Sequence, residues 1–477
     1  MELTEMTPPL WQLSATALVE GFKQQRWTPV QALESVLARM EAVNPQLNAV
    51  VALAPDAAAS AEAASERYRR GVPCSALDGV PISIKDNLML KGVPCTWGTK
   101  ALAGAIADHD ERPVARLREL GAVLFAKTNV PEFTLEGYTG NPVYGVTRNP
   151  WDPATTPGGS SGGAVAAVAA GIGPLALCTD GGGSIRRPAA HSHLFGFKPA
   201  IGAIERGEGL PQLLLDMEVV GPVARCAEDL ELLYLALSDK PGTAKNELDQ
   251  ASPPLRRVLS VEQLGGDTPV DPQIRTAMAQ GRALLEAQGI EVVQGPLPID
   301  LEALNQCWSQ VGEIGLARLA QRYPQWLAMA SEPYQAMAER GAGASAVQLW
   351  QILDLLNELR GQIANIFTEW DAILTPSIAA PAWPAEQRFP EQIDGETVGP
   401  RGHAVFTGWV NAVGSASINL PLPVEASAPR AGMQLIAPMG REPALFAVAR
   451  RYQAQTDPGA QFSGLWQQLG AVASPVT

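Results

Sequence analysis

Residues 163–170 constrain the fold more than any other segment, because all of them are glycine, alanine or valine. A helix built from these residues has no polar face to turn toward water, so it must be buried. Its small side chains also let neighbouring elements pack closely against it. We therefore expect an interior helix here, and the rest of the fold must enclose it.

Short apolar runs and helical patterns alternate along the first half of the chain. The apolar runs cover residues 80–84, 122–126 and 175–177, and the helical patterns cover residues 114–120 and 164–170. Strands that alternate with helices usually form a sheet with helices on both faces. The pattern predicts an α/β fold in which a mixed β-sheet is sandwiched between layers of α-helices.

Two helices are expected before the first of these strands. Thr28 and Pro29 provide an N-cap and a first-turn proline, and apolar residues recur after them at helical spacing. A second, alanine-rich helix follows Asp56, continues to Arg70 and ends at Gly71. We interpret both helices as scaffold.

The second half of the chain contains a pattern typical of a β-α-β unit. An apolar run at residues 258–259 precedes a helix capped by Asp271 and Pro272, and residues 290–293 form the next strand-like run. The segment 301–367 is mainly helical in pattern. We expect the unit to extend the sheet and the helices to follow it.

Charge and composition exclude several kinds of partner. The 477 residues carry a net charge of −14, whereas nucleic acids and anionic membranes attract clustered Lys and Arg. The acidic N-terminus lacks the basic and apolar regions of a signal peptide, and no segment has 18 uncharged apolar residues. The five cysteines show no CxxC or disulfide-framework spacing. We therefore expect a cytoplasmic protein without a nucleic-acid or membrane partner.

Two serines lie in glycine-rich runs on either side of the buried helix. Ser160 lies in the run 155–163, and Ser184 follows three glycines. Glycines let backbone N–H groups approach a developing oxyanion closely, so Ser184 can be the nucleophile of an acyl transfer. The candidate oxyanion hole consists of the backbone N–H groups of Gly181, Gly182, Gly183 and Ser184.

A single lysine, Lys85, ends the apolar run that begins at Val80. Burial at this position would lower the pKa of its amine, because low-dielectric surroundings disfavour the charged form. A neutral amine has the lone pair that a base needs, and an ammonium does not. The N-terminus of the buried helix points toward the Ser160 loop and adds positive potential that favours the neutral form. Lys85 is therefore a candidate base.

These three motifs, with their spacing, resemble those of the amidase signature family. Flanking landmarks at residues 127–133, 147–152 and 196–199 are similar to the family as well. The resemblance implies a Ser-cisSer-Lys amidohydrolase, in which Ser184 forms the acyl-enzyme, Ser160 relays the proton and Lys85 is the base. It further implies a cis peptide bond between Gly159 and Ser160, and a structural pairing of Asp180 with Arg186 that braces the glycine loop.

The resemblance also organises the chain. We expect a single amidase domain over residues 1–477. The signature core with the catalytic motifs occupies residues 71–240, a variable region with the added β-α-β unit occupies 241–370, and residues 371–477 return to the core. The resemblance is faint in the middle of the chain, which is where substrate choice usually lies.

The sequence does not identify which carbon–nitrogen bond is cleaved. The substrate is expected to be a small-molecule amide, and primary amides, anilides, linear oligoamides and carbamates such as urethanes all stay open, as does assembly into a homodimer. We expect no cofactor and no metal, since no His, Cys or Asp set has ligand spacing. Candidate substrate-binding residues are Tyr138, Gly159 and Trp409, although core packing is favoured for the two aromatic residues.

Two other functions share features with this chain. The amidase (A) subunit of a glutamine-dependent tRNA amidotransferase has the same motifs but works only with partner subunits. A Ser-His-acid esterase uses a G-x-S-x-G turn, which residues 158–162 satisfy, but that turn follows a strand and here a loop precedes it. Such an esterase also needs a histidine, and His191 and His193 are those close to Ser184 in sequence.

Two further features are interpreted as structural. The run from Asp108 through His109 and Asp110 to Glu111 is interpreted as a solvated helix cap, because contiguous side chains point in different directions and make a poor metal site. Cys178 has apolar neighbours and is expected to be a small core residue.

Overall fold

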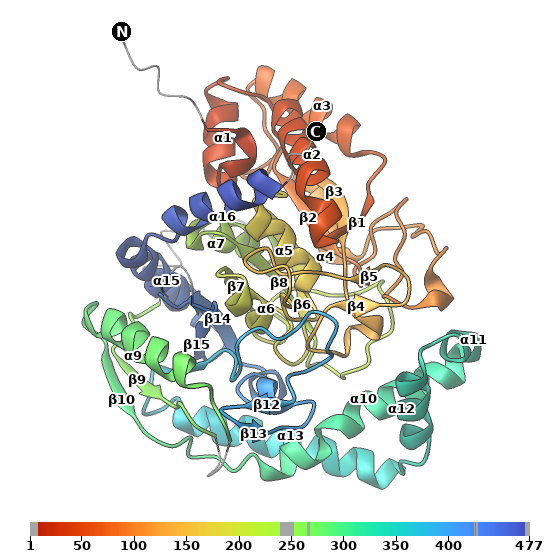
Figure 1. The fold of residues 1–477 in the computed structure, drawn as a ribbon, viewed down its shortest axis with the longest axis vertical. Helices are drawn as coiled ribbons and strands as arrows, with labels where there is room; N and C mark the ends of the chain where they lie inside the picture. Colours follow the sequence, from red (N-terminus) through yellow and green to blue (C-terminus); the bar gives the residue numbers. More distant parts are fainter. Residues whose placement is uncertain (1–7, 239–251, 265–267, 424, 426–427, 473–477) are drawn as a thin grey trace.

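Eleven strands form one mixed sheet that runs through the protein (Figure 1). The computed structural model describes residues 8–238, 252–264, 268–423, 425 and 428–472. In sheet order the strands are β1 (Val50–Leu53), β3 (Val123–Thr128), β2 (Pro81–Lys85), β6 (Leu175–Asp180), β8 (Val219–Ala224), β7 (Phe195–Lys198), β14 (Ala416–Pro421), β15 (Gly432–Ala437), β11 (Ala372–Pro376), β9 (Arg257–Ser260) and β10 (Glu291–Gln294). Two small hairpins pair β4 (Gly140–Asn141) with β5 (Gly145–Val146) and β12 (Gln392–Ile393) with β13 (Glu396–Thr397).

Helices flank this sheet along its length. They are α1 (Ala15–Lys23), α2 (Pro29–Leu47), α3 (Ala57–Arg69), α4 (Arg112–Glu119), α5 (Gly162–Ala170), α6 (Arg186–His191), α7 (Ala227–Leu237), α9 (Pro272–Glu286), α10 (Glu302–Arg322), α11 (Pro324–Ala328), α12 (Glu332–Ala342), α13 (Ala346–Ile366), α14 (Gly408–Ala412), α15 (Glu442–Thr456) and α16 (Pro458–Val472). Short 3₁₀ turns cover Leu10–Gln12, Lys100–Leu102, Glu132–Thr134 and Gly402–Ala404. The expected α/β architecture is therefore confirmed.

The helix α5 is the enclosed element that its composition predicts. Every residue of α5 is buried. It packs on strands β2, β3, β6 and β8, and helices α2 and α16 cover its other side. Because its side chains are no larger than valine, the covering helices approach the sheet closely.

The sheet is mixed: the edge strand β1 pairs antiparallel with β3, β3-β2-β6 and β11-β9-β10 are parallel, and the strands between β6 and β11 pair antiparallel. Strand β2 runs parallel to both β3 and β6, whereas β6 and β7 pair antiparallel with β8. The predicted β-α-β unit is present as β9, α9 and β10, and its two parallel strands form the end of the sheet opposite β1 (Figure 1). The predicted helical segment forms α10 to α13.

The N-terminal scaffold helices also match their sequence signals. Thr28 and Gln31 form a capping box at the start of α2, and Pro29 is its first residue. Helix α3 stops before Gly71, which has a φ of 71°, a left-handed conformation that suits glycine. The expected boundary at residues 240–241 and the N-terminal residues 1–7 lie outside the described part of the chain.

No helix in the described part of the chain is both long enough and apolar enough to cross a bilayer.

Parallel pairing sets the position of the candidate site. The carboxyl ends of β2 and β6 meet at one edge of the sheet, because the two strands run in the same direction. Lys85 is the last residue of β2, and β6 ends at Asp180, just before the glycine loop and Ser184. The loop before α5 carries Ser160 to the same edge. The fold thus gathers the three sequence motifs at one place.

Candidate functional site

Lys85 lies fully buried at the end of β2. Its Nζ donates a hydrogen bond of 2.8 Å to Ser160 Oγ. It is also 2.9 Å from Thr179 Oγ1 and 3.1 Å from the Thr179 carbonyl oxygen. No carboxylate forms an ion pair with Lys85 in the described part of the protein, so its surroundings solvate the amine by dipoles alone.

Burial lowers the pKa of Lys85 to about 8, against the opposing charge of Glu218. Glu218 lies in a chain of charges, since Arg206 Nη1 is 2.5 Å from its carboxylate and Arg206 Nε is 2.8 Å from Glu111. The positive charge of Arg206 itself also lowers the pKa of Lys85. Arg206 therefore offsets the carboxylate that would otherwise favour the ammonium form.

The peptide bond between Gly159 and Ser160 is cis, as the family resemblance implies. Gly159 lies against the backbone of Tyr138, where a Cβ atom would come within 2.2 Å of the Tyr138 carbonyl oxygen. A side chain at position 159 would therefore push the Ser160 loop away from the sheet. This close approach explains why glycine precedes Ser160.

Ser184 is 7% exposed and follows the glycine loop after β6. The N–H groups of Gly181, Gly182 and Ser184 make no hydrogen bond to any described residue. The N–H of Gly183 instead donates to Asp180 Oδ1 at 2.7 Å. Residue 183 is thus engaged elsewhere, and the other three groups are those available to an oxyanion.

Gly183 has a structural role in the loop. Its φ is 115°, a conformation that residues with side chains rarely adopt, and a Cβ would lie 2.2 Å from Thr407 Oγ1. Glycine accommodates this backbone conformation without strain, so Gly183 sets the shape of the loop at this point.

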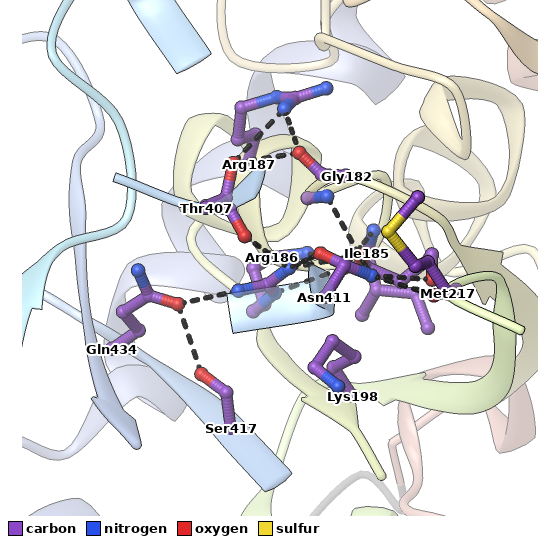
Figure 2. A network of polar contacts seen from close by, with 12 residues as sticks. Gly182, Ile185, Arg186, Arg187, Lys198, Met217, Thr407, Asn411, Ser417 and Gln434 are labelled. Atoms are coloured by element: carbon purple, nitrogen blue, oxygen red, sulfur yellow. Dashed lines mark hydrogen bonds and ion pairs between the residues drawn. The ribbon is translucent and has the colours of Figure 1, made fainter. Parts of the chain in front are cut away.

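A buried ion pair braces this loop, as the resemblance implies. Arg186 and Asp180 are both fully buried and lie 2.9 Å apart. Arg186 also donates to Gln434 Oε1 and Asn411 Oδ1, so one guanidinium links the loop to strand β15 and helix α14 (Figure 2). Burial alone would raise the pKa of Asp180, but Arg186 and the loop amides hold it below its ordinary value.

The two serine loops are joined through their backbones. The N–H of Ser161 donates to the carbonyl oxygen of Ser184 at 3.2 Å. No hydrogen bond links the hydroxyls of Ser160 and Ser184 in this structure. Contacts between catalytic groups often tighten only when substrate is bound. The structure therefore places the two loops in contact through their backbones, with the two hydroxyls not bonded to each other.

A cavity of about 430 Å³ opens beside Ser184. The glycine loop contributes Gly181 and Gly182 to its wall, and helices α10 and α12 contribute Trp308 and Met337. The volume suits a small molecule. Ser184 is thus the one residue of the predicted catalytic set that reaches this space.

The other candidate residues lie deeper or elsewhere. Trp409 is 2% exposed in an apolar cluster, and Tyr138 packs against the main core, so neither lines the cavity. Gly159 touches the site indirectly, because its carbonyl oxygen is 3.5 Å from Arg187 Nη2. Cys178 is fully buried in the core, which confirms its structural interpretation.

The histidines near Ser184 in sequence do not approach it. His191 is buried and its Nε2 lies 3.1 Å from the Ala380 carbonyl oxygen, while His193 packs against Trp151. Burial lowers the pKa of His191 to about 4 and that of His193 to about 3. Neither has a carboxylate partner among the described residues, so no Ser-His-acid triad is assembled. His403, from a distant segment, lines the cavity.

The interpretation of residues 108–111 as a solvated cap is wrong at one position. Glu111 is fully buried and pairs with Arg206, because the loop carrying Arg206 and Gly209 packs against its carboxylate and the N–H of Met89 donates to it. His109 is exposed next to Asp108, and Asp110 accepts from Arg118. These side chains point to different partners.

Sequence reasoning missed Thr179, Glu218 and Arg206 around Lys85, and Trp308 in the cavity wall. Thr179 had a signal, because it lies directly before Asp180 at the end of a strand parallel to β2. The others come from loops and helices outside the motifs and meet the site only through tertiary packing.

Comparison with known proteins gives consistent results along the chain. The sequence profile of the amidase family matches residues 31–446. An indoleacetamide hydrolase from Bradyrhizobium diazoefficiens is 32% identical over 459 residues, covering 91% of this chain and 84% of the relative. The A subunit of a glutamyl-tRNA(Gln) amidotransferase from Chromohalobacter salexigens is 28% identical over 478 residues, covering 93% and 96% respectively.

Solved structures share the whole fold. A bacterial aryl acylamidase superposes with a TM-score of 0.85 at 25% identity, covering 97% of this chain and 99% of that one. A 6-aminohexanoate cyclic dimer hydrolase in complex with substrate superposes with a TM-score of 0.86 at 27% identity, covering 96% and 100% respectively. The similarity therefore includes the motifs, the sheet and the helices of the middle region.

Proposed function

The chain belongs to the amidase signature family of amidohydrolases, and we propose that it hydrolyses a linear amide, anilide or carbamate bond through an acyl-enzyme on Ser184. One observation carries this proposal. A buried lysine with a lowered pKa lies 2.8 Å from the hydroxyl of Ser160, on the loop that meets the Ser184 loop. Burial of an ammonium without an anionic partner is costly, so the site favours the neutral amine, which is the form that a base needs.

The proposed reaction begins when Ser184 Oγ attacks the carbonyl carbon of the substrate. The Ser184 proton passes to Ser160 Oγ as the Ser160 proton passes to Lys85 Nζ, which becomes an ammonium. The tetrahedral intermediate then collapses, and the proton returns through Ser160 to the nitrogen of the departing amine. Water then attacks the acyl-enzyme and gives a proton through Ser160 to Lys85. A proton returns through Ser160 to Ser184 Oγ as the acid leaves, which restores Ser184.

The negative oxygen of the intermediate needs donors that are already in place. Among the described residues, no acceptor binds the N–H groups of Gly181, Gly182 and Ser184, so they supply these donors without rearrangement. Asp180 holds the loop by accepting from Gly183 and Ile185. The loop is thereby fixed on both sides of the nucleophile.

We expect Arg206 to control the pH range of the enzyme. In Arg206→Gln, the Glu218 carboxylate loses its partner and the pKa of Lys85 rises, so the ammonium persists to higher pH. Since the neutral amine is the active form, the rising limb of kcat/KM should move up by about 1 pH unit. Arg206→Lys keeps the charge and should leave the limb near that of the wild type. An unmoved limb in Arg206→Gln would show that Lys85 does not govern it.

A free-standing amidase and an amidotransferase subunit differ in what the isolated chain does. We expect the purified protein to hydrolyse simple amides by itself, and a panel of p-nitroanilide, primary amide, urethane and glutamine substrates checks this. Negligible turnover of every substrate alone, with strong stimulation by amidotransferase partner subunits and charged tRNA, would assign the chain to the amidotransferase function instead.

We further propose where the enzyme acts and what kind of partner it binds. The net charge of −14 and the five free cysteines support a cytoplasmic enzyme that acts on a small molecule without nucleic-acid or membrane partners. The chemistry above uses only side chains and backbone groups of the chain.

A further inference from the structure

The cavity beside Ser184 contains four arginines that fall into two groups. Arg340 Nε lies 2.8 Å from Glu313, and Arg388 pairs with Glu136, so two of the cations are neutralised within the cavity wall. The other two have no carboxylate within ion-pair distance among the described residues. These are Arg187 and Arg401.

Arg187 comes from the start of α6, three residues after Ser184, and is 6% exposed. Its Nη1 donates to Thr407 Oγ1 at 3.0 Å and to the carbonyl oxygen of Gly182. Figure 2 shows this guanidinium joined to Thr407 and Gly182, and Thr407 in turn joined to Arg186. Its Nε is buried without any hydrogen-bond partner. The side chain is therefore fixed at the nucleophile's loop with donor capacity left over.

Arg401 lines the same cavity. Its guanidinium carbon lies 4.6 Å from the ring centroid of Trp308, a cation–π contact that orients the group without neutralising it. Burial and the charge of Arg187 lower the pKa of Arg401 to about 9, and burial lowers that of Arg187 to about 10. The two guanidinium groups therefore repel each other, and neither forms an ion pair with a carboxylate among the described residues.

His403 provides an independent sign that a polar ligand belongs here. Its ring is 3% exposed and lines the cavity, yet neither ring nitrogen has a hydrogen-bond partner among the described residues. Burial, Arg187 and Arg401 all lower the pKa of His403, so the ring is neutral and one nitrogen carries a proton it can donate. Buried polar atoms are usually satisfied, and an acceptor in the cavity would satisfy this one.

We propose that the amide cleaved by this enzyme carries a carboxylate, which Arg187 and Arg401 bind in the cavity while Ser184 attacks the carbonyl carbon. The proposal rests on the hydrolytic function proposed above and names its substrate class. A carboxylate accepts several charge-assisted hydrogen bonds, so it satisfies both guanidinium groups at once. Apolar residues in the same walls, Leu135, Leu214 and Met337, suit a hydrocarbon segment between the carboxylate and the amide.

Binding to the Ser184→Ala protein tests this without any turnover. Two ligand pairs place the carboxylate on either side of the amide: the mono-anilide of glutaric acid with its methyl ester, and N-hexanoylglycine with its methyl ester. Calorimetric titration should show the acid of at least one pair binding about 10- to 100-fold more tightly than its ester, the range expected for charged hydrogen bonds. The pair that shows the preference identifies the side of the amide that bears the charge.

Variants of the cavity arginines then locate the preference. In the Ser184→Ala background, Arg401→Gln should abolish most of the preference for the acid, and Arg401→Lys should keep part of it. Arg340→Gln should leave the preference unchanged, because the Arg340 cation is already paired. Arg187→Gln should also abolish most of the preference for the acid, provided that thermal melting shows the variant to be folded. If it is unfolded, the Arg401 variants decide the outcome.

Equal binding of acid and ester in both pairs, or no binding of either acid, overturns the carboxylate assignment. So does a loss in Arg340→Gln as large as that in Arg401→Gln. Because no turnover is measured, these outcomes are separate from failure of the hydrolytic function, which the substrate panel on the wild-type enzyme detects.

Discussion

Replacing Ser184 with alanine should lower kcat/KM for amide hydrolysis by roughly 10⁵-fold or more, the scale seen when a serine nucleophile is removed from a hydrolase. Ser184 is the one residue of the predicted catalytic set that lines the cavity, and it directly follows the glycine loop whose N–H groups are the expected oxyanion donors. Steady-state kinetics on the substrate that the panel identifies would measure the loss.

Ser161→Ala is the matched control for this variant. Ser161 lies in the opposing serine loop and is fully buried, and its Oγ donates to the Thr179 carbonyl oxygen at 3.2 Å. Its loss removes one hydrogen bond of about 1 kcal/mol and leaves the nucleophile in place. Activity in Ser161→Ala should stay within about tenfold of the wild type. A Ser184→Ala protein with near-normal turnover would contradict the assignment.

Lys85→Met should cost about 10²- to 10⁴-fold in kcat/KM, the usual contribution of a positioned base. Methionine fills the same buried volume without an amine, so the variant separates lost chemistry from lost packing. In the wild type, activity should rise with pH through about 8, since Lys85 must lose its proton to accept one from Ser184. The Lys85→Met profile should lack this rising limb.

Lys198 offers a control for the same profile, because it is a second buried lysine whose pKa burial lowers, to about 7. Its Nζ donates to the Pro199 carbonyl oxygen, away from both serines. Lys198→Met should therefore keep the rising limb near pH 8. Ser160→Ala should fall between the wild type and Ser184→Ala, because it breaks the proton path and leaves the nucleophile intact. Loss of the limb in Lys198→Met alone would contradict the role of Lys85.

Local sequence signals were enough to predict the helix and the strand next to the site. The all-apolar composition of residues 163–170 predicted the burial of α5, and the apolar run at 80–84 predicted a buried strand that ends at Lys85. These signals are local, because one element's periodicity and burial are encoded in its own residues. Family motifs added the cis peptide bond before Ser160, which no residue pattern predicts.

Tertiary contacts account for what the sequence did not reveal. Glu111 was interpreted as part of a solvated helix cap because contiguous side chains point in different directions, yet Arg206, 95 positions later, pairs with it. The sequence makes the Gly183 N–H a candidate oxyanion donor, but in the structure this N–H donates to Asp180 Oδ1. Trp308 and Arg401 meet across the cavity from segments that lack any motif. Side-chain pairing over such separations depends on the whole fold and leaves no short-range pattern.

Labelling with a fluorophosphonate tests the central claim most directly, since this reagent bonds covalently to an activated serine oxygen. Intact mass measurement of the wild type followed by peptide mapping should find one adduct, located on Ser184. Lys85→Met should label far more slowly, and Ser184→Ala should not label at all. An adduct on any other residue, or an adduct that persists in Ser184→Ala, would contradict the acyl-enzyme on which the proposed function depends.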